Sequence, residues 1–230
     1  MRLINVFLLT LTLTIAACGG GGDSSGPKAP IASTNSFDIS AGYKRISQSG
    51  FTKNLNVSGT CTGSFSLTNA PATTPTTFES AAAFSGNSVS SLTLSNCTPA
   101  SNVATSTRYF DSTYAPLGYS SFGGNYGVWA NPAVLPTSAK VGDVAIVGII
   151  NLFSNSSKSF ITGRQEISYV IEADTATTAI ANLISKHYNA SNTLTGTEQD
   201  RYRVAADGSL TLISMDIQNA NGSTTHLLMN

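Results

Sequence analysis

Alternating side-chain type over residues 55–68 constrains the fold of this chain more than any other feature. Ser, Thr and Asn fill one parity of the segment, while apolar residues, glycine and one cysteine fill the other. The second parity comprises Leu55, Val57, Gly59, Cys61, Gly63, Phe65 and Leu67. Because successive side chains of a strand point to opposite faces, this period of two predicts one long β-strand with a single apolar face. Gly59 and Gly63 indicate close packing or a bend.

Weaker β signals recur along the rest of the chain. Further strands are predicted at 78–84, 88–94, 105–110, 144–153, 160–172, 199–206, 209–218 and 224–229. Asp207-Gly208 and Asn221-Gly222 are hairpin turn dipeptides, and a slip of parity predicts a bulge near Leu212. The run 144–153 is continuously apolar, which is typical of a strand buried on both faces. We therefore expect a mainly β fold, an antiparallel sheet forming a sandwich or a partly open barrel.

One helix is predicted near residues 175–188. Asp174 or Thr175 would cap its start, and apolar residues follow at helical spacing. These residues are Ala176, Ala179, Ile180, Leu183, Ile184, His187 and Tyr188. We expect this helix to lie on the sheet.

The first residues carry an export pattern. Met1 and Arg2 begin the chain, an apolar and threonine run extends to Ile15, and Ile15-Ala16-Ala17-Cys18 closes it. The run is shorter than the roughly 20 residues of a membrane-spanning helix, which favours a cleaved signal peptide. A glycine-rich, proline-containing stretch follows directly.

The four residues ending at Cys18 resemble the lipobox of bacterial lipoproteins. That resemblance implies a signal peptide at 1–17, a lipidated Cys18 with a flexible tether at 18–36, and a single β-rich domain at 37–230. Gly19 stands where an Asp would imply retention in the inner membrane, so the resemblance implies attachment to the outer membrane. It does not indicate which face of that membrane carries the protein. The chain is similar to uncharacterised lipoproteins of Gram-negative bacteria, which implies a location and no activity.

Low charge limits the partners that can be expected. Charged residues make up 10% of the chain and the formal net charge is +0. Such a chain offers no basic patch for nucleic acid and no polybasic segment for anionic lipid. We expect membrane contact only through the N-terminal lipid, together with a protein or glycan partner, and no cofactor.

Three cysteines divide between two roles. With Cys18 lipidated, Cys61 and Cys97 remain as an even pair in an exported chain and predict a disulfide. The alternative is that Cys61 is a nucleophile, because residues 59–63 match G-x-C-x-G. A nucleophile elbow needs a helix after the nucleophile, and the alternation continues through Cys61 instead. The disulfide is the favoured interpretation.

Other candidate catalytic patterns are weak. Residues 118–123 nearly match G-x-S-x-G, but Phe122 replaces the second glycine, so a glycine-rich loop is favoured. His187 and His226 are the only histidines, and a Ser-His-Asp arrangement could recruit either in space. We expect structural roles for both and no metal site.

Charged residues on the predicted strands have a structural explanation. Glu172 and Asp174 share a parity, as do Arg201 and Arg203. A cross-strand charge ladder on a solvent face is expected of them. A carboxylate pair for acid–base work would require a pocket.

An aromatic, glycine-rich passage is the candidate binding surface. It contains Tyr114, Tyr119, Phe122, Tyr126 and Trp129. Exposed Tyr and Trp on loops stack on sugars or anchor protein partners, although a β domain also needs aromatic residues in its core.

Three function classes remain open. The favoured class is a lipid-anchored envelope protein that acts as a non-enzymatic binding or structural module. The alternative is a carrier of an apolar or lipid ligand in a cavity of the β domain. A hydrolase ranks third, because no catalytic set is evident.

Overall fold

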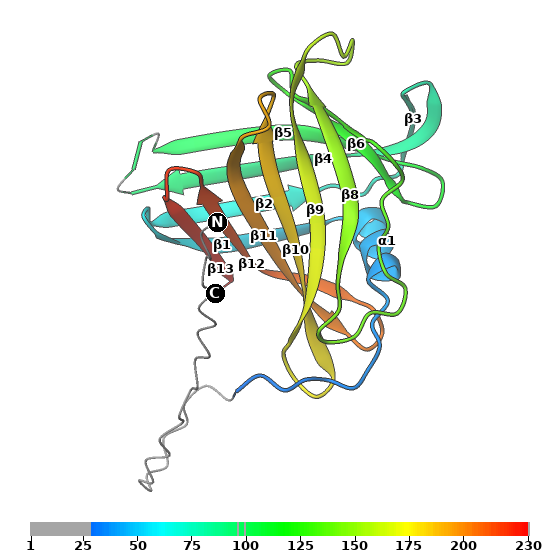
Figure 1. Cartoon of the computed structure of the whole chain (residues 1–230), viewed down its shortest axis with the longest axis vertical. Coiled ribbons are helices and arrows are strands. Elements are labelled where there is room, and N and C mark those ends of the chain that lie inside the picture. Colours follow the sequence, from blue (N-terminus) through cyan, green and yellow to red (C-terminus); the bar gives the residue numbers. More distant parts are fainter. Residues whose placement is uncertain (1–28, 96, 99, 230) are drawn as a thin grey trace, which may run out of the picture.

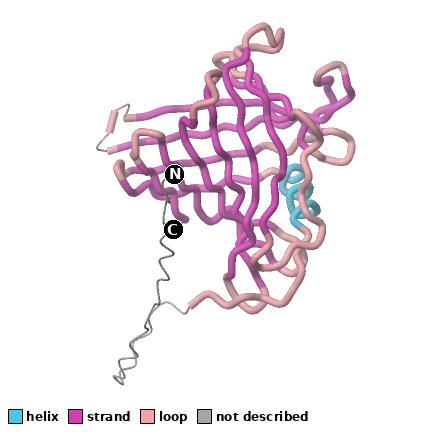
Figure 2. The backbone as a smooth tube through the Cα atoms, viewed as in Figure 1, coloured by secondary structure: helices cyan, strands magenta, loops and turns pink. Residues whose placement is uncertain are grey.

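The computed structural model describes residues 29–95, 97–98 and 100–229, and its strands surround an interior, with a helix at one side (Figures 1 and 2). The expected mainly β, antiparallel fold with one helix is confirmed. In chain order the elements are α1 (Ile39–Ser49), β1 (Phe51–Gly59), β2 (Gly63–Asn69), β3 (Thr74–Phe78), β4 (Ala81–Leu94), β5 (Ser101–Phe110), β6 (Pro116–Ser121), β7 (Tyr126–Trp129), β8 (Val144–Phe153), β9 (Ile161–Ala173), β10 (Thr178–Asn189), β11 (Leu194–Ala205), β12 (Leu210–Asn219) and β13 (Thr224–Met229). Among the described residues, no helix is long and apolar enough to span a membrane.

The sheet closes on itself at β2. This strand pairs with β1 along one edge and with β4 along the other, so twelve strands form a complete ring. The described strand β3 pairs with β4 outside that ring. The sandwich alternative is therefore wrong, and the barrel is closed rather than partly open. Because barrel diameter grows with strand number, twelve strands enclose more space than the eight that side chains can just fill.

The segment 55–68 is a hairpin, and the prediction of one continuous strand is wrong. β1 and β2 pair in antiparallel register, with Leu55 opposite Phe65. The chain reverses after Gly59, whose φ of 102° suits a residue without a Cβ. Apolar residues of both strands keep one parity, since both arms turn the same face inward. The alternation therefore predicted the apolar face correctly and concealed the turn.

The helix lies elsewhere than predicted. Residues 178–189 form β10, which pairs with β9 and β11 along nearly its whole length. Ala179, Ala181 and Leu183 belong to the inward parity, while Ile180 and Ile184 lie on the outer one. Apolar residues on both faces of a strand produce the i, i+3, i+4 spacing of a helix by coincidence. Pairing on both edges decides the conformation.

The helix α1 has ordinary local causes that the sequence reading missed. Asp38 caps its start by accepting a hydrogen bond from the amide of Ala41 at 2.8 Å. Gly50 ends it with a φ of 67°, and its amide donates to the carbonyl of Ile46. Ile39, Tyr43 and Ile46 recur at i, i+4 and i+7, so they share one face.

α1 lies across one end of the barrel. Its Ser40 amide donates to the carbonyl of Pro136 in the β7–β8 connection, and its Ser47 carbonyl accepts from Ala72 after β2. Gly42 packs against Gly208 in the β11–β12 turn. Since these connections all follow strands that run in the same direction, they lie at the same end. The helix therefore covers this mouth.

The chain reaches the covered end before α1 begins. Ile31 bridges to Asp174, Ser33 donates to the carbonyl of Ala176, and Phe37 bridges to Ala139. Contacts with the barrel thus start inside the segment 18–36 assigned to the tether. The predicted signal peptide at 1–17 and Cys18 lie outside the described residues.

Two strand predictions need further correction. Residues 81–84 of the first predicted strand and all of 88–94 belong to one strand, β4. Phe78 ends β3, and the chain reverses at Glu79-Ser80, both with positive φ. β8 has the predicted bounds, but it is not buried on both faces. Val144 and Ile146 are 65% and 75% exposed, because the outer face of this part of the ring carries no second layer.

Two apolar clusters fill parts of the interior. One lies next to α1 and joins β8, β9, β10 and β11; it comprises Phe37, Ile39, Ala139, Val147, Tyr169, Ile171, Ala179, Ala181 and Val204. The other joins β1, β12 and β13 and comprises Leu55, Val57, Leu212, Met215 and Leu227. A third cluster, Phe78, Ala83 and Tyr126, forms at the β3–β4 hairpin.

The predicted bulge near Leu212 is present, as a register shift opposite Arg201 and Tyr202.

Candidate functional site

The barrel interior contains a cavity. One region measures about 510 Å³ and an adjoining region about 460 Å³. Tyr43 of α1, Arg108 of β5 and Asp200 of β11 line both regions, so the two are parts of one space, here called the lumen cavity. Volumes of about 300–1,000 Å³ are usual for small-molecule sites.

Apolar residues from both sides of the ring line the lumen cavity. They are Met215 of one interior cluster and partly buried residues packed against the two interior clusters, namely Phe51, Phe65, Leu67, Ile167 and Leu183. Serines on β4, β5 and β10 also line it, among them Ser90, Ser106 and Ser185. The inward parity of the ring therefore mixes apolar side chains with hydroxyls.

Arg108 is the cation of the lumen cavity. Its Nη2 donates to the carbonyl of Ala70 at 3.0 Å, and the guanidinium lies 5.5 Å from the centre of the Phe110 ring. Its Nε is buried without a hydrogen-bond partner among the described residues. Burial lowers the pKa of Arg108, which reports how far the cation is removed from water.

Glu198 and Asp200 form a carboxyl pair on β11. They are two residues apart on one strand, so both point inward. Asp200 Oδ1 is buried and lacks a hydrogen-bond partner among the described residues. Burial, followed by the negative charge of Glu198, raises the pKa of Asp200 well above its usual range. Asp200 therefore favours the neutral, protonated carboxyl form.

Two tyrosines line the same cavity, Tyr43 of α1 and Tyr202 of β11. Burial raises the pKa of Tyr43 and of Tyr202, and the charges of Arg108 and Asp200 act on both phenols. Each therefore keeps its O–H proton and remains a hydrogen-bond donor.

Arg108 and Asp200 come from opposite sides of the ring. β5 and β11 are separated by six steps in either direction around the twelve strands. The sequence reading missed Arg108, Glu198 and Asp200. The strand parity could have indicated that both side chains face inward. Asp200 has the parity of buried Val204, and Arg108 has the parity of buried Phe110.

The two histidines do not meet. His187 Nε2 lies 3.7 Å from Glu198 Oε2, and its Nδ1 contacts the Gln165 amide at 3.1 Å. His226 is on the outer parity of β13 and contacts Asp216. No Ser-His-Asp set assembles around either histidine in the described part of the chain, and no group of three or more His, Cys, Asp or Glu residues there could hold a metal ion.

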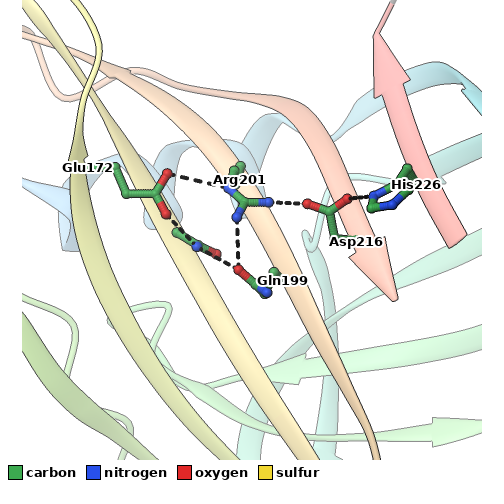
Figure 3. Close-up of polar contacts among 6 residues, drawn as sticks. Glu172, Gln199, Arg201, Asp216 and His226 are labelled. Atoms are coloured by element: carbon green, nitrogen blue, oxygen red, sulfur yellow. Dashed lines mark hydrogen bonds and ion pairs between the residues drawn. The ribbon is translucent and has the colours of Figure 1, made fainter. Parts of the chain in front are cut away.

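The expected charge ladder is present on the outer face. Arg201 pairs with Glu172 and Asp216, and Arg203 pairs with Asp174. Figure 3 shows Arg201 at the centre of a network that runs from β9 to β13. Its members are Glu172, Asn182, Gln199, Arg201, Asp216 and His226. These charges lie on the parity opposite to Asp200 and do not line the lumen cavity.

The predicted aromatic residues are divided among several environments. Phe122 is 94% exposed, whereas Tyr126 is 8% exposed and donates to Glu79. Tyr119 and Trp129 line the lumen cavity. Tyr114 stacks on Phe84 at the covered end, with ring centres 5.6 Å apart. The five residues therefore do not form one exposed patch. Residues 118–121 belong to β6 and residues 122–123 to the turn that follows, so the glycine-rich loop expected at 118–123 is wrong for its first four residues.

The disulfide prediction is confirmed. Cys61 in the β1–β2 turn is bonded to Cys97 in the β4–β5 connection. The bond joins two turns at the end opposite α1. It also removes the G-x-C-x-G alternative, because a bonded sulfur is no nucleophile.

Comparisons with known proteins add no assignment. No family model matches the chain, and neither the curated proteins nor the solved structures yield a match. The lumen cavity is therefore the basis for a functional argument.

Proposed function

We propose that this chain is a lipid-anchored envelope protein whose barrel binds a small molecule in the lumen cavity and so acts as a binding or carrier module. One observation carries the proposal: Arg108 Nε and Asp200 Oδ1 are buried without hydrogen-bond partners in the described part of the chain, at a cavity large enough for a ligand. Buried polar groups without partners are costly, and a bound molecule would supply those partners.

The anchor part of the proposal rests on Cys18 and its lipobox. The described chain from Ile31 to Phe37 follows the end covered by α1. An anchor attached there would hold the covered end toward the membrane. Attachment to the outer membrane belongs to the same proposal.

Metabolic labelling with an alkyne fatty acid tests the anchor. The wild-type protein should carry the label and separate with membranes. Cys18→Ser should lose the label while the folded part remains, because lipidation requires the thiol. Label retained on Cys18→Ser would contradict the anchor and leave the cavity argument untouched.

Filling the lumen cavity tests the binding function. The probe is N-phenyl-1-naphthylamine, an uncharged dye that fluoresces in apolar surroundings. Wild-type protein should bind it saturably. Ser90→Phe places a ring in the lumen cavity and should weaken binding by roughly tenfold or more, since the site is occupied.

The matched control is Ser91→Phe. Ser91 follows directly on β4 and has the outer parity, so the same added ring leaves the lumen cavity open. The control should bind the dye like wild type. Equal binding by both variants would indicate surface adsorption, and absence of binding by all three proteins would refute the proposed function.

A further inference from the structure

Arg108 differs from the other described arginines in having no carboxylate partner. Each of the other four forms an ion pair. These pairs are Arg45–Asp207, Arg164–Glu166, Arg201–Glu172 and Arg203–Asp174. No such pair reaches Arg108 from the described residues, although its Nε is buried and burial lowers its pKa. A cation withdrawn from water without a carboxylate partner would gain from an anionic ligand.

Hydrogen-bond donors surround the same space. Tyr43 and Tyr202 keep their phenolic protons, and the charge of Arg108 acts on both. Ser47 is 0% exposed, and its Oγ has no hydrogen-bond partner among the described residues. A guanidinium with hydroxyl donors beside it matches the several lone pairs of a carboxylate or phosphate group.

The opposite wall carries the carboxyl pair Glu198 and Asp200. Glu198 Oε2 lies 3.7 Å from His187 Nε2. Burial raises the pKa of Asp200, which reduces the negative charge that this wall presents to an anionic ligand. As a protonated carboxyl, Asp200 donates one hydrogen bond and accepts others.

The remaining lining accommodates an apolar body. Phe51, Phe65 and Leu67 lie on one side of the lumen cavity, and Ile167 and Leu183 lie on the other. Apolar contact of this kind contributes roughly 25 cal/mol per Å² removed from water. The lining thus combines one cationic point with an extended apolar surface.

We propose that the ligand of the lumen cavity is an amphiphilic organic anion, with its carboxylate or phosphate head on Arg108 and its apolar body against the apolar residues of the same cavity. This inference rests on the proposed function and specifies its ligand class. A free fatty acid and a lipid phosphate share the required chemistry. The two sources differ in head group, which an experiment can separate.

Four probes with the same ten-carbon chain test the charge requirement: decanoate, decylphosphonate, decanol and decylammonium. Each competes with N-phenyl-1-naphthylamine on the full-length chain held in amphipol, with amphipol alone as the blank. We expect either anion to bind roughly tenfold or more tightly than decanol, because the buried guanidinium gains its partner. The tighter of the two anions identifies the head group.

Arg108→Gln should remove that preference and bind decanoate and decanol alike, with dye binding retained. Retained dye binding also shows that the variant folds. Arg201→Gln, on the outer face, is the matched control and should keep the preference of wild type. Arg108→Lys keeps a positive charge and should retain part of the preference for anions over decanol.

Three results would overturn the inference. Equal affinity of the wild-type protein for decanol and both anions would leave the lumen as a binding site and remove the anion from it. Tightest binding of decylammonium would assign the charge recognition to Glu198 and Asp200. Absence of binding by every probe and by the dye would refute the proposed function itself.

Discussion

Gly42 of α1 lies against the carbonyl oxygen of Gly208 in the β11–β12 turn, where a Cβ at position 42 would stand 2.2 Å from that oxygen. The same Cβ would lie 2.7 Å from Leu210 Cγ. This contact lets the helix sit close enough to the barrel end for Tyr43, the next residue, to reach the lumen cavity. Glycine at position 42 is therefore required for α1 to pack closely over this end of the barrel.

Gly42→Ala should destabilise the protein even though alanine favours helices. Helix propensity alone would stabilise it by about 1 kcal/mol, but the forced shift of α1 should cost more, giving a net loss of roughly 1–3 kcal/mol. Urea denaturation measures the change. Gln48→Ala, at an exposed position of the same helix, should stay within about 0.5 kcal/mol. Equal stability of Gly42→Ala and wild type would mean that the helix does not pack closely here.

The disulfide should contribute substantially to stability. Cys61 and Cys97 are 36 residues apart, and closing a loop of that length restricts the unfolded chain by roughly 3–4 kcal/mol in the chain-entropy account. The double variant Cys61→Ala/Cys97→Ala should unfold at correspondingly lower urea concentration. Wild-type protein treated with a reductant should approach the same midpoint, whereas the double variant should not respond to reductant. An unchanged urea midpoint for both the double variant and the reduced wild-type protein would show that the disulfide contributes little to stability.

Local sequence signals correctly predicted two hairpin turns and one bulge. Asp207-Gly208 supplies a turn with positive φ at Gly208, and Asn221-Gly222 does the same at Gly222. The bulge near Leu212 followed from a change of parity within one strand. Each of these features depends on a few adjacent residues, so alternation and turn chemistry are sufficient to predict them.

Ring closure and the site depend on contacts that no local pattern contains. The β2–β4 pairing skips β3, so neighbours in sequence are not neighbours in the ring. A partly polar lumen also blurs the inward parity, because Ser88 and Ser90 face inward as Leu92 does. Arg108 and Asp200 line the same cavity only because of the order of the twelve strands. The lumen cavity therefore could not be inferred before the topology was known.

Arg201 should matter more to stability than Arg203. Arg201 is 25% exposed and joins Glu172, Gln199 and Asp216, whereas Arg203 is 50% exposed and pairs with Asp174. Arg201→Met leaves two partly buried carboxylates without their shared partner and should cost roughly 1–3 kcal/mol. Arg203→Met should cost roughly 1 kcal/mol or less, since water screens the exposed pair. Denaturant midpoints of the two variants decide it, and the reverse order would refute the importance of the network.

Asp200 should make stability fall as pH rises. Its raised pKa means that the folded state keeps a proton that the unfolded chain, with an Asp pKa of about 3.9, gives up. The contribution is fully present below about pH 4 and is lost as pH rises through the folded-state pKa. Asp200→Asn cannot ionise, so its stability relative to wild type should increase steadily above about pH 4.

Asp174 provides the matched variant of opposite sign. The hydrogen bond from Arg203 lowers the pKa of Asp174, so its contribution is present above about pH 4 and is lost as pH falls through the lowered value. Asp174→Asn should therefore be less stable than wild type at pH 7 and converge with it in acid. Urea denaturation of both variants between pH 3 and 8 should give difference curves of opposite slope. If the stability difference between Asp200→Asn and wild type does not change with pH, Asp200 ionises freely in the lumen cavity. Its carboxylate would then repel an anionic ligand.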